Sequence, residues 1–67
     1  MNTQERYHVK AQTYNFGQDV EFTVFDRKLN KTVKVFKGSA KDKTTAAAMR
    51  DANTLSYDLN NAQGWDD

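Results

Sequence analysis

The chain has 67 residues, a formal net charge of +1 and no cysteine. A chain of this length buries only about 60% of the surface that it exposes when unfolded, so we expect modest stability. Without cysteine there is no disulfide framework and no thiolate metal site. The longest apolar run, residues 46–49, is too short to span a bilayer, and the first residues lack the apolar core of a signal peptide. We therefore expect a single cytoplasmic domain over residues 1–67, with an ordered core over about 6–65 and no membrane partner.

The first predicted element is a strand that begins near Tyr7. Tyr7, Val9 and Ala11 alternate with polar residues, and side chains that lie two apart on a strand share one face. Asn15 and Gly17 are typical turn residues, so the chain is expected to reverse around positions 15–17. Matching of the apolar faces favours an even number of residues in this loop.

Two further strands are predicted to form a β-hairpin. Val20, Phe22 and Val24 lie two apart, and Val33 and Val35 do the same. If the connecting loop covers residues 27–30, both apolar sets lie on one face of the sheet, with Val24 opposite Val33 and Phe22 opposite Val35. In this register Asp26 pairs with Lys31.

The connecting loop needs a residue that tolerates a left-handed backbone conformation. Asn30 is the last residue of that loop, and asparagine adopts a positive φ more readily than most residues. We therefore expect a positive φ at Asn30.

An amphipathic helix is predicted to follow and to cover the apolar face of the sheet. Apolar residues recur at helical spacing; they are Ala48, Ala52, Leu55, Leu59 and Ala62. Ser39 or Asp42 is the expected N-cap, and Gly64 suits the position after the last turn. The expected fold is α+β, a two-layer βββα domain in which a three-stranded antiparallel meander carries one C-terminal helix on one face. Replacing Leu55 with Ala should cost about 2–5 kcal/mol if that side chain is fully buried.

The charge is distributed unevenly along the chain. Residues 27–43 contain seven basic residues and a single acid, Asp42, whereas from Thr44 onward one basic residue, Arg50, stands against four aspartates. A positive patch of this kind attracts polyanions, and phosphate contacts supply most of the non-specific affinity for nucleic acid. The alternative is that the lysines only keep the hairpin soluble and prevent pairing at the sheet edge.

The sheet face away from the helix is the second candidate feature. On the expected register it combines basic, polar and aromatic side chains, which are Arg6, His8, Lys10, Thr23, Phe25, Lys34 and Phe36. Basic groups can bind phosphates while aromatic rings contact bases or sugars. The alternative is that Phe25 and Phe36 pack beneath the chain termini or form a dimer contact.

Nothing in the sequence favours catalysis. His8 is the single histidine, and no nucleophile or second metal ligand stands at a recognisable spacing from it. Asp51 and Asp58 flank the apolar helix stripe and are expected to be solvated charges rather than an acid–base pair. We therefore expect no enzyme activity, no catalytic residue, no metal and no cofactor.

Residues 7–62 resemble small nucleic-acid-binding modules built from three strands and a helix. One such module is the arm-type DNA-binding domain of phage-type integrases, and another is the C-terminal part of the double-stranded-RNA-binding domain. In the segment Ser39-Ala40-Lys41-Asp42-Lys43-Thr44-Thr45-Ala46-Ala47-Ala48, the serine, Lys41 and the later alanines match the start of the last helix of the RNA-binding family. The resemblance implies nucleic-acid binding, and small chains of this kind are similar to phage and mobile-element proteins.

The leading hypothesis is a small protein that binds nucleic acid, double-stranded DNA in particular, through the open sheet face and the basic hairpin. The predicted contact residues are Lys10, Thr23, Phe25, Arg27, Lys28, Lys34, Phe36, Lys37, Lys41 and Lys43. The alternatives are a protein-interaction module that modulates a host protein, with Phe25, Phe36 and Tyr57 as apolar anchors, or a structural homodimer that packs through the sheet face.

Overall fold

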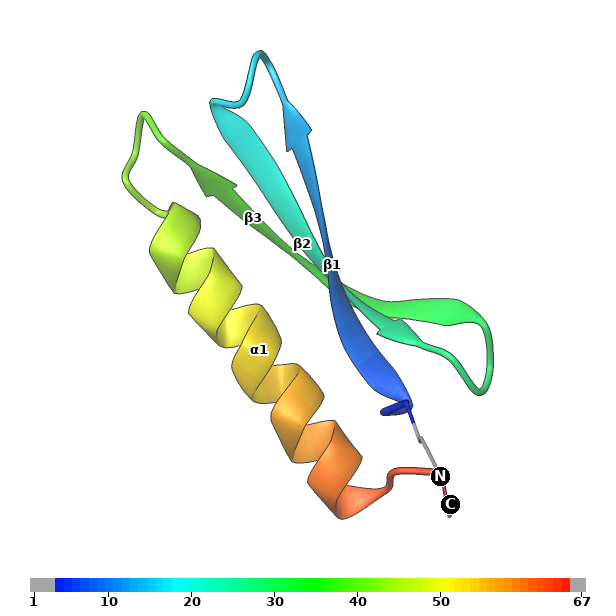
Figure 1. Ribbon diagram of the computed structural model, residues 1–67. Helices are drawn as coiled ribbons and strands as arrows, with labels where there is room; N and C mark the ends of the chain where they lie inside the picture. Colours follow the sequence, from blue (N-terminus) through cyan, green and yellow to red (C-terminus); the bar gives the residue numbers. More distant parts are fainter. Residues whose placement is uncertain (1–3, 66–67) are drawn as a thin grey trace.

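A computed structural model describes residues 4–65, so residues 1–3 and 66–67 of the predicted domain lie outside the described part. Its three strands are β1 (Tyr7–Tyr14), β2 (Asp19–Asp26) and β3 (Lys31–Ser39), which form one antiparallel sheet in the order β1-β2-β3. The helix α1 (Thr45–Ala62) lies across one face of this sheet (Figure 1). This arrangement confirms the predicted α+β βββα fold with one helix at the C-terminal end.

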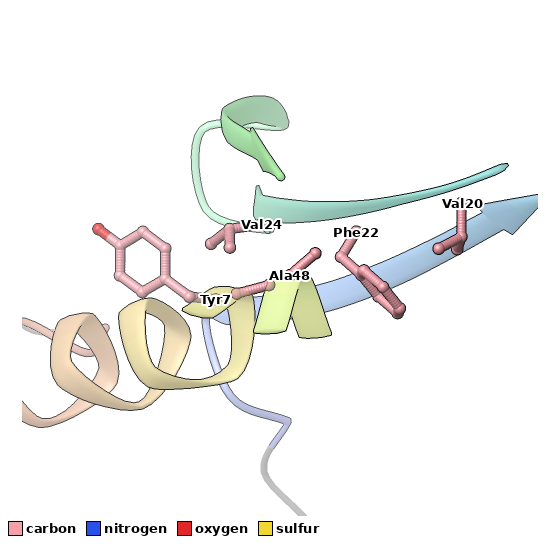
Figure 2. Packing of buried hydrophobic residues seen from close by; sticks show 6 residues of the cluster. Tyr7, Val20, Phe22, Val24 and Ala48 are labelled. Carbon is pink, nitrogen blue, oxygen red and sulfur yellow. The ribbon is translucent and has the colours of Figure 1, made fainter. Parts of the chain in front are cut away.

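The core lies between the central strand β2 and the helix. The alternation predicted for β2 is confirmed, since Val20, Phe22 and Val24 are buried and Val24 is completely so. Figure 2 shows these side chains with Tyr7 and Ala48, and the methyl group of Ala52 completes the cluster. Alanines on the buried helix stripe let the backbone of α1 approach the sheet closely, which compensates for the small number of large apolar residues.

The register of β3 differs from the predicted one because the strand contains a β-bulge. Asp26 pairs with Lys31 as expected, but Val24 lies opposite Lys34 instead of Val33, and Phe22 lies opposite Phe36 instead of Val35. An extra residue on one strand of a pair reverses the faces of everything beyond it. As a result, the predicted pairs of Val24 with Val33 and of Phe22 with Val35 are wrong.

Packing explains why the bulged register is favoured. It places the ring of Phe36 against the core and Gly38 beneath the start of α1. Val35 turns to the open face opposite Thr23 and is 39% exposed, and Val33, the extra residue at the bulge, is 41% exposed. A regular β3 would instead have directed Lys37 towards the helix, where a charge is costly to bury.

The turns of both hairpins agree with the predictions. Asn30 has a φ of +57°, so the left-handed residue before β3 is confirmed. In the first hairpin Tyr14 pairs with Asp19, which leaves a loop with the expected even number of residues. Positive φ values at Asn15, Phe16 and Gly17 form its turn.

The helix begins later than predicted. Neither Ser39 nor Asp42 caps it, because α1 starts at Thr45 and Thr44 occupies the N-cap position without a side-chain cap bond. The Thr44 hydroxyl oxygen instead accepts a hydrogen bond from the Ser39 backbone N–H at 2.9 Å, which closes the loop between β3 and α1. At the other end Gly64 has a φ of +55° and its N–H donates to the Leu59 carbonyl, as expected for a glycine that ends a helix.

Polar side chains of α1 bind the edge strand β1. The Ser56 hydroxyl donates to the Tyr7 carbonyl at 2.8 Å. The Asn60 amide both accepts from the Tyr7 N–H and donates to its carbonyl, each at 2.9 Å. Ala62, which was predicted to belong to the buried stripe, is exposed, and Leu55 and Leu59 are half-buried. Hydrogen bonds to β1 therefore take over from apolar packing towards the end of the helix.

Candidate functional site

The predicted contact residues fall into four regions of the structure. Lys10, Thr23, Phe25 and Lys37 lie on the open face of the sheet, while Lys34 and Phe36 lie on the helix side because of the bulge. Arg27 and Lys28 lie in the turn between β2 and β3, and Lys41 and Lys43 lie in the loop between β3 and α1. The open face that the sequence predicted is therefore not assembled as expected, since Lys34 and Phe36 are absent from it.

Of the two phenylalanines predicted for the open face, Phe25 remains there, in contact with Lys10 and His8. The Lys10 Nζ lies 3.9 Å from the centroid of the Phe25 ring, and the His8 ring meets it edge-on at 5.6 Å. Burial, together with the positive charges of Arg27 and Lys10, lowers the pKa of His8. The imidazole is thus neutral at pH 7 and adds no charge to this face.

The far end of the open face is occupied by a small polar network. The Tyr14 hydroxyl donates to the Glu21 carboxylate at 3.2 Å, and the Lys37 Nζ lies 3.9 Å from the other Glu21 oxygen. Partial burial and the hydrogen bond to Glu21 raise the pKa of Tyr14. Between this network and Phe25 the face carries Lys10, Thr23 and Val35, so it is mixed in character and not uniformly basic.

Arg6, which was predicted to lie on the open face, is buried in an ion pair with Asp26. The Arg6 Nε and Nη2 donate to the two Asp26 carboxylate oxygens at 2.8 and 2.9 Å, and Nη1 donates to the Gly64 carbonyl at 3.0 Å. The Lys28 and Leu29 backbone N–H groups also donate to this carboxylate. These contacts, the Arg6 hydrogen bond first, lower the pKa of Asp26 to about 2.

The sequence contains a signal for this pair. Asp26 continues the buried alternation of β2 after Val24, and a carboxylate in a buried position requires a cation or several hydrogen-bond donors. The pair ties residues before β1 and after α1 to the turn between β2 and β3. It therefore fixes the position of Arg27 and Lys28, which lie in that turn.

The basic residues of segment 27–43 are gathered along one edge of the molecule. We call this set the basic edge: Arg27, Lys28, Lys31, Lys34, Lys37, Lys41 and Lys43. The strand β3 is an outer strand of the sheet, and the two loops that flank it extend the row at either end (Figure 1). All of these side chains are exposed except Arg27, which is half-buried.

Most of the basic edge is free of carboxylate partners. Within residues 4–65, Lys31, Lys34, Lys41 and Lys43 form no ion pair. Arg27 donates a hydrogen bond to the Gln4 side chain, and the Lys28 Nζ donates one to the Trp65 carbonyl. Lys37 is the member of the edge that pairs with a carboxylate, that of Glu21, so four of the seven cations carry a charge that no ion pair within residues 4–65 balances.

A shallow hollow of about 510 Å³ lies between the β1–β2 turn and the loop that precedes α1. Asp19, Glu21 and Asp42 line it together with Lys37 and Tyr14. Three carboxylates in one hollow repel a phosphate, so this depression is poorly suited to hold an anion.

In the part of the chain that the structure describes, no group of histidine, aspartate or glutamate side chains is placed to hold a metal ion. No helix there is both long and apolar enough to cross a membrane. Comparison with known proteins found no matching family model, no matching curated protein and no matching solved structure.

Proposed function

We propose that this protein binds nucleic acid, double-stranded DNA in particular, and holds the phosphate backbone along the basic edge. One observation carries the proposal: seven basic residues with a single intervening acid lie along one outer strand and its flanking loops. A row of cations, four of which form no ion pair within residues 4–65, favours a linear polyanion, because each phosphate contact releases counterions.

The spacing of the lysines on β3 supports a linear ligand. Lys31 and Lys34 lie opposite Asp26 and Val24, two residues apart on β2, which corresponds to about 7 Å along the strand. Two successive base pairs of duplex DNA also advance by about 7 Å. The bulge places Lys31 and Lys34 on the same side of the sheet although they are an odd number of residues apart. Both can therefore approach one DNA strand.

The open face takes a secondary part in this proposal. Lys10 and Thr23 reach it from the two strands that do not carry the basic edge, and Phe25 lies between Lys10 and His8. These side chains supply contacts close to the bases or sugars, whereas Phe36 supports the core instead. A cytoplasmic location is part of the same proposal.

A second candidate function is supported by the apolar part of the open face. Val35 is 39% exposed and shares that face with Phe25, and Val33 at the neighbouring bulge is 41% exposed. Packing of two copies of the chain through this face would cover all three side chains. This homodimer predicts a sedimentation coefficient and a melting temperature that both depend on protein concentration.

Fluorescence anisotropy with labelled duplex DNA, duplex RNA and single strands tests the proposed function. If the four lysines without ion pairs each contact a phosphate of duplex DNA, the logarithm of the affinity should fall with the logarithm of salt with a slope of about −3.6. Affinity should then drop roughly 150-fold between about 50 and 200 mM salt. Tighter binding to duplex RNA or to single strands would show that the preferred ligand is that nucleic acid and not duplex DNA.

Matched variants locate the contact. Replacing Lys34 with Gln should reduce the magnitude of the slope by about 0.9, because one counterion fewer is released. Replacing Arg50 with Gln removes the same charge from the exposed surface of α1 and should leave the slope unchanged. Binding that ignores salt, or an equal effect of both variants, contradicts binding along the basic edge.

A further inference from the structure

The tip of the first hairpin carries an aromatic side chain in an unfavourable position. Phe16 is fully exposed, at 109% of its reference area, and has a φ of +57°. Its ring therefore contributes nothing to the core. Bulky residues rarely adopt positive φ, because Cβ then crowds the following carbonyl.

The turn geometry shows which residue would normally stand there. Asn15 and Phe16 both have positive φ, and the Gly17 N–H donates to the Tyr14 carbonyl at 3.0 Å. These are the features of a type I′ turn, whose second central position strongly favours glycine. Asn15 suits its own position, but Phe16 stands where glycine would stabilise the turn. The fold itself thus gives no reason for a phenylalanine at this point, and strained exposed residues are concentrated at functional sites.

The tip lies beside cations of the basic edge. The Ala40 N–H donates to the Gln18 carbonyl at 2.7 Å, which joins the β1–β2 turn to the loop that carries Lys41 and Lys43. Figure 1 shows both loops at the same end of the molecule. Both lysines are exposed and free of ion pairs among residues 4–65. A ligand held by these lysines would therefore lie at the end of the molecule that carries the hairpin tip.

We propose that Phe16 stacks on the face of a nucleobase in the nucleic acid that the basic edge holds. This inference rests on the proposed function and adds the group that contacts the bases. Aromatic side chains stack on unpaired bases, and apolar side chains such as phenylalanine also insert between base pairs of a duplex. Both modes require a protruding ring that is not packed against its own protein, which is the state of Phe16.

Replacement of Phe16 by Gly tests the proposal, since it should affect stability and binding in opposite directions. The variant relieves the backbone strain and should unfold at a higher temperature than the wild type. It should also bind nucleic acid about 5- to 100-fold more weakly, the range expected for loss of one stacked base. Phe16→Asn, which also tolerates positive φ, should show the same loss of affinity, and Phe16→Trp should retain binding. Leu29→Ala removes an exposed apolar side chain from the other hairpin turn and should change neither the unfolding temperature nor the affinity for nucleic acid.

Oligonucleotides that contain 2-aminopurine identify the base that is contacted. A fluorescence change on binding of a single strand, absent with Phe16→Gly, assigns stacking on an unpaired base. The same result with a duplex assigns insertion at a base step. If the wild type binds but Phe16→Gly binds equally well, or neither oligonucleotide responds, stacking is wrong while the basic edge stands. If the wild type shows no salt-dependent binding at all, the proposed function fails and stacking fails with it.

Discussion

The contact between Gly38 and the first turn of α1 makes the Gly38→Ala variant a strict test of the packing. A Cβ atom at this position would lie 2.7 Å from the Thr45 Cα and 3.1 Å from the Thr44 carbonyl oxygen. Ordinary contacts begin near 3.4 Å, so the closest pair must move apart by about 0.7 Å, from 2.7 to 3.4 Å. Because both neighbouring atoms belong to the backbone, no side-chain rotation can relieve the clash.

The expected sign follows from two opposing effects. Gly38 is not among the residues with positive φ, so alanine fits its backbone conformation, and the loss of freedom in the unfolded chain would by itself stabilise the fold by about 0.4–1 kcal/mol. Overpacking of this severity costs about 1–3 kcal/mol. The net effect should be a loss of about 1–2 kcal/mol, which lowers the melting temperature of so small a domain by about 4–16 °C.

Thermal unfolding followed by circular dichroism measures this change, and amide chemical shifts locate it. In Gly38→Ala the shifts should concentrate at Thr44 and Thr45. Gly17→Ala is the matched control, because its added Cβ meets nothing within 4 Å and its strain, at a φ of +89°, is confined to the first hairpin. A Gly38→Ala protein that is as stable as the wild type, or more stable, would refute the close approach of helix and strand.

Three further predictions concern the ion pair, the register and the helix. The pKa of Asp26 is lowered from 3.8 to about 2 in the folded state, so the stability that the ionised carboxylate contributes is complete above about pH 5 and is lost as the pH falls from 3.8 to about 2. Asp26→Asn should flatten this part of an acid-denaturation curve, and an unchanged curve would contradict the pairing with Arg6. Phe36→Ser should lower the melting temperature strongly whereas Phe25→Ser should change it little. The opposite order would show that β2 and β3 pair without the bulge. Leu55→Ala should cost about 1–2 kcal/mol in urea denaturation, less than for full burial, and a loss above about 3 kcal/mol would show that this side chain is more deeply packed.

The sequence was sufficient to predict the elements and their order. The spacing of Val20, Phe22 and Val24 specified the buried face of β2, and Asn30 and Gly64 marked a turn and a helix end because their positions demand left-handed backbone. These are local signals, in which each residue type reports directly on its own conformation.

The errors arose where tertiary packing decides between locally equivalent choices. Alternation at Val33 and Val35 fits a regular strand as well as a bulged one, and only the need for Phe36 in the core and for Gly38 under the helix selects the bulge. For the same reason Arg6 was predicted to lie on the open face, since its partner Asp26 is twenty residues away in the sequence.

The consequence for the candidate site was larger than for the fold. The bulge removed Phe36 and Lys34 from the open face but left the basic residues on β3 and its flanking loops. A shift of one residue changes the sheet face to which a side chain points, but it does not change the strand's place at the edge of the sheet. Phe16 was overlooked because the turn was predicted from its neighbours Asn15 and Gly17. The exposure of the Phe16 ring is visible only in the folded structure.

A map of backbone amide chemical shifts during titration with duplex DNA at low salt tests the basic edge most directly. The largest changes should fall within residues 27–43, with a second group at the β1–β2 turn, and they should disappear as salt is raised. Largest changes on the outward surface of α1 around Tyr57, or a spectrum that does not respond to DNA, would contradict the account.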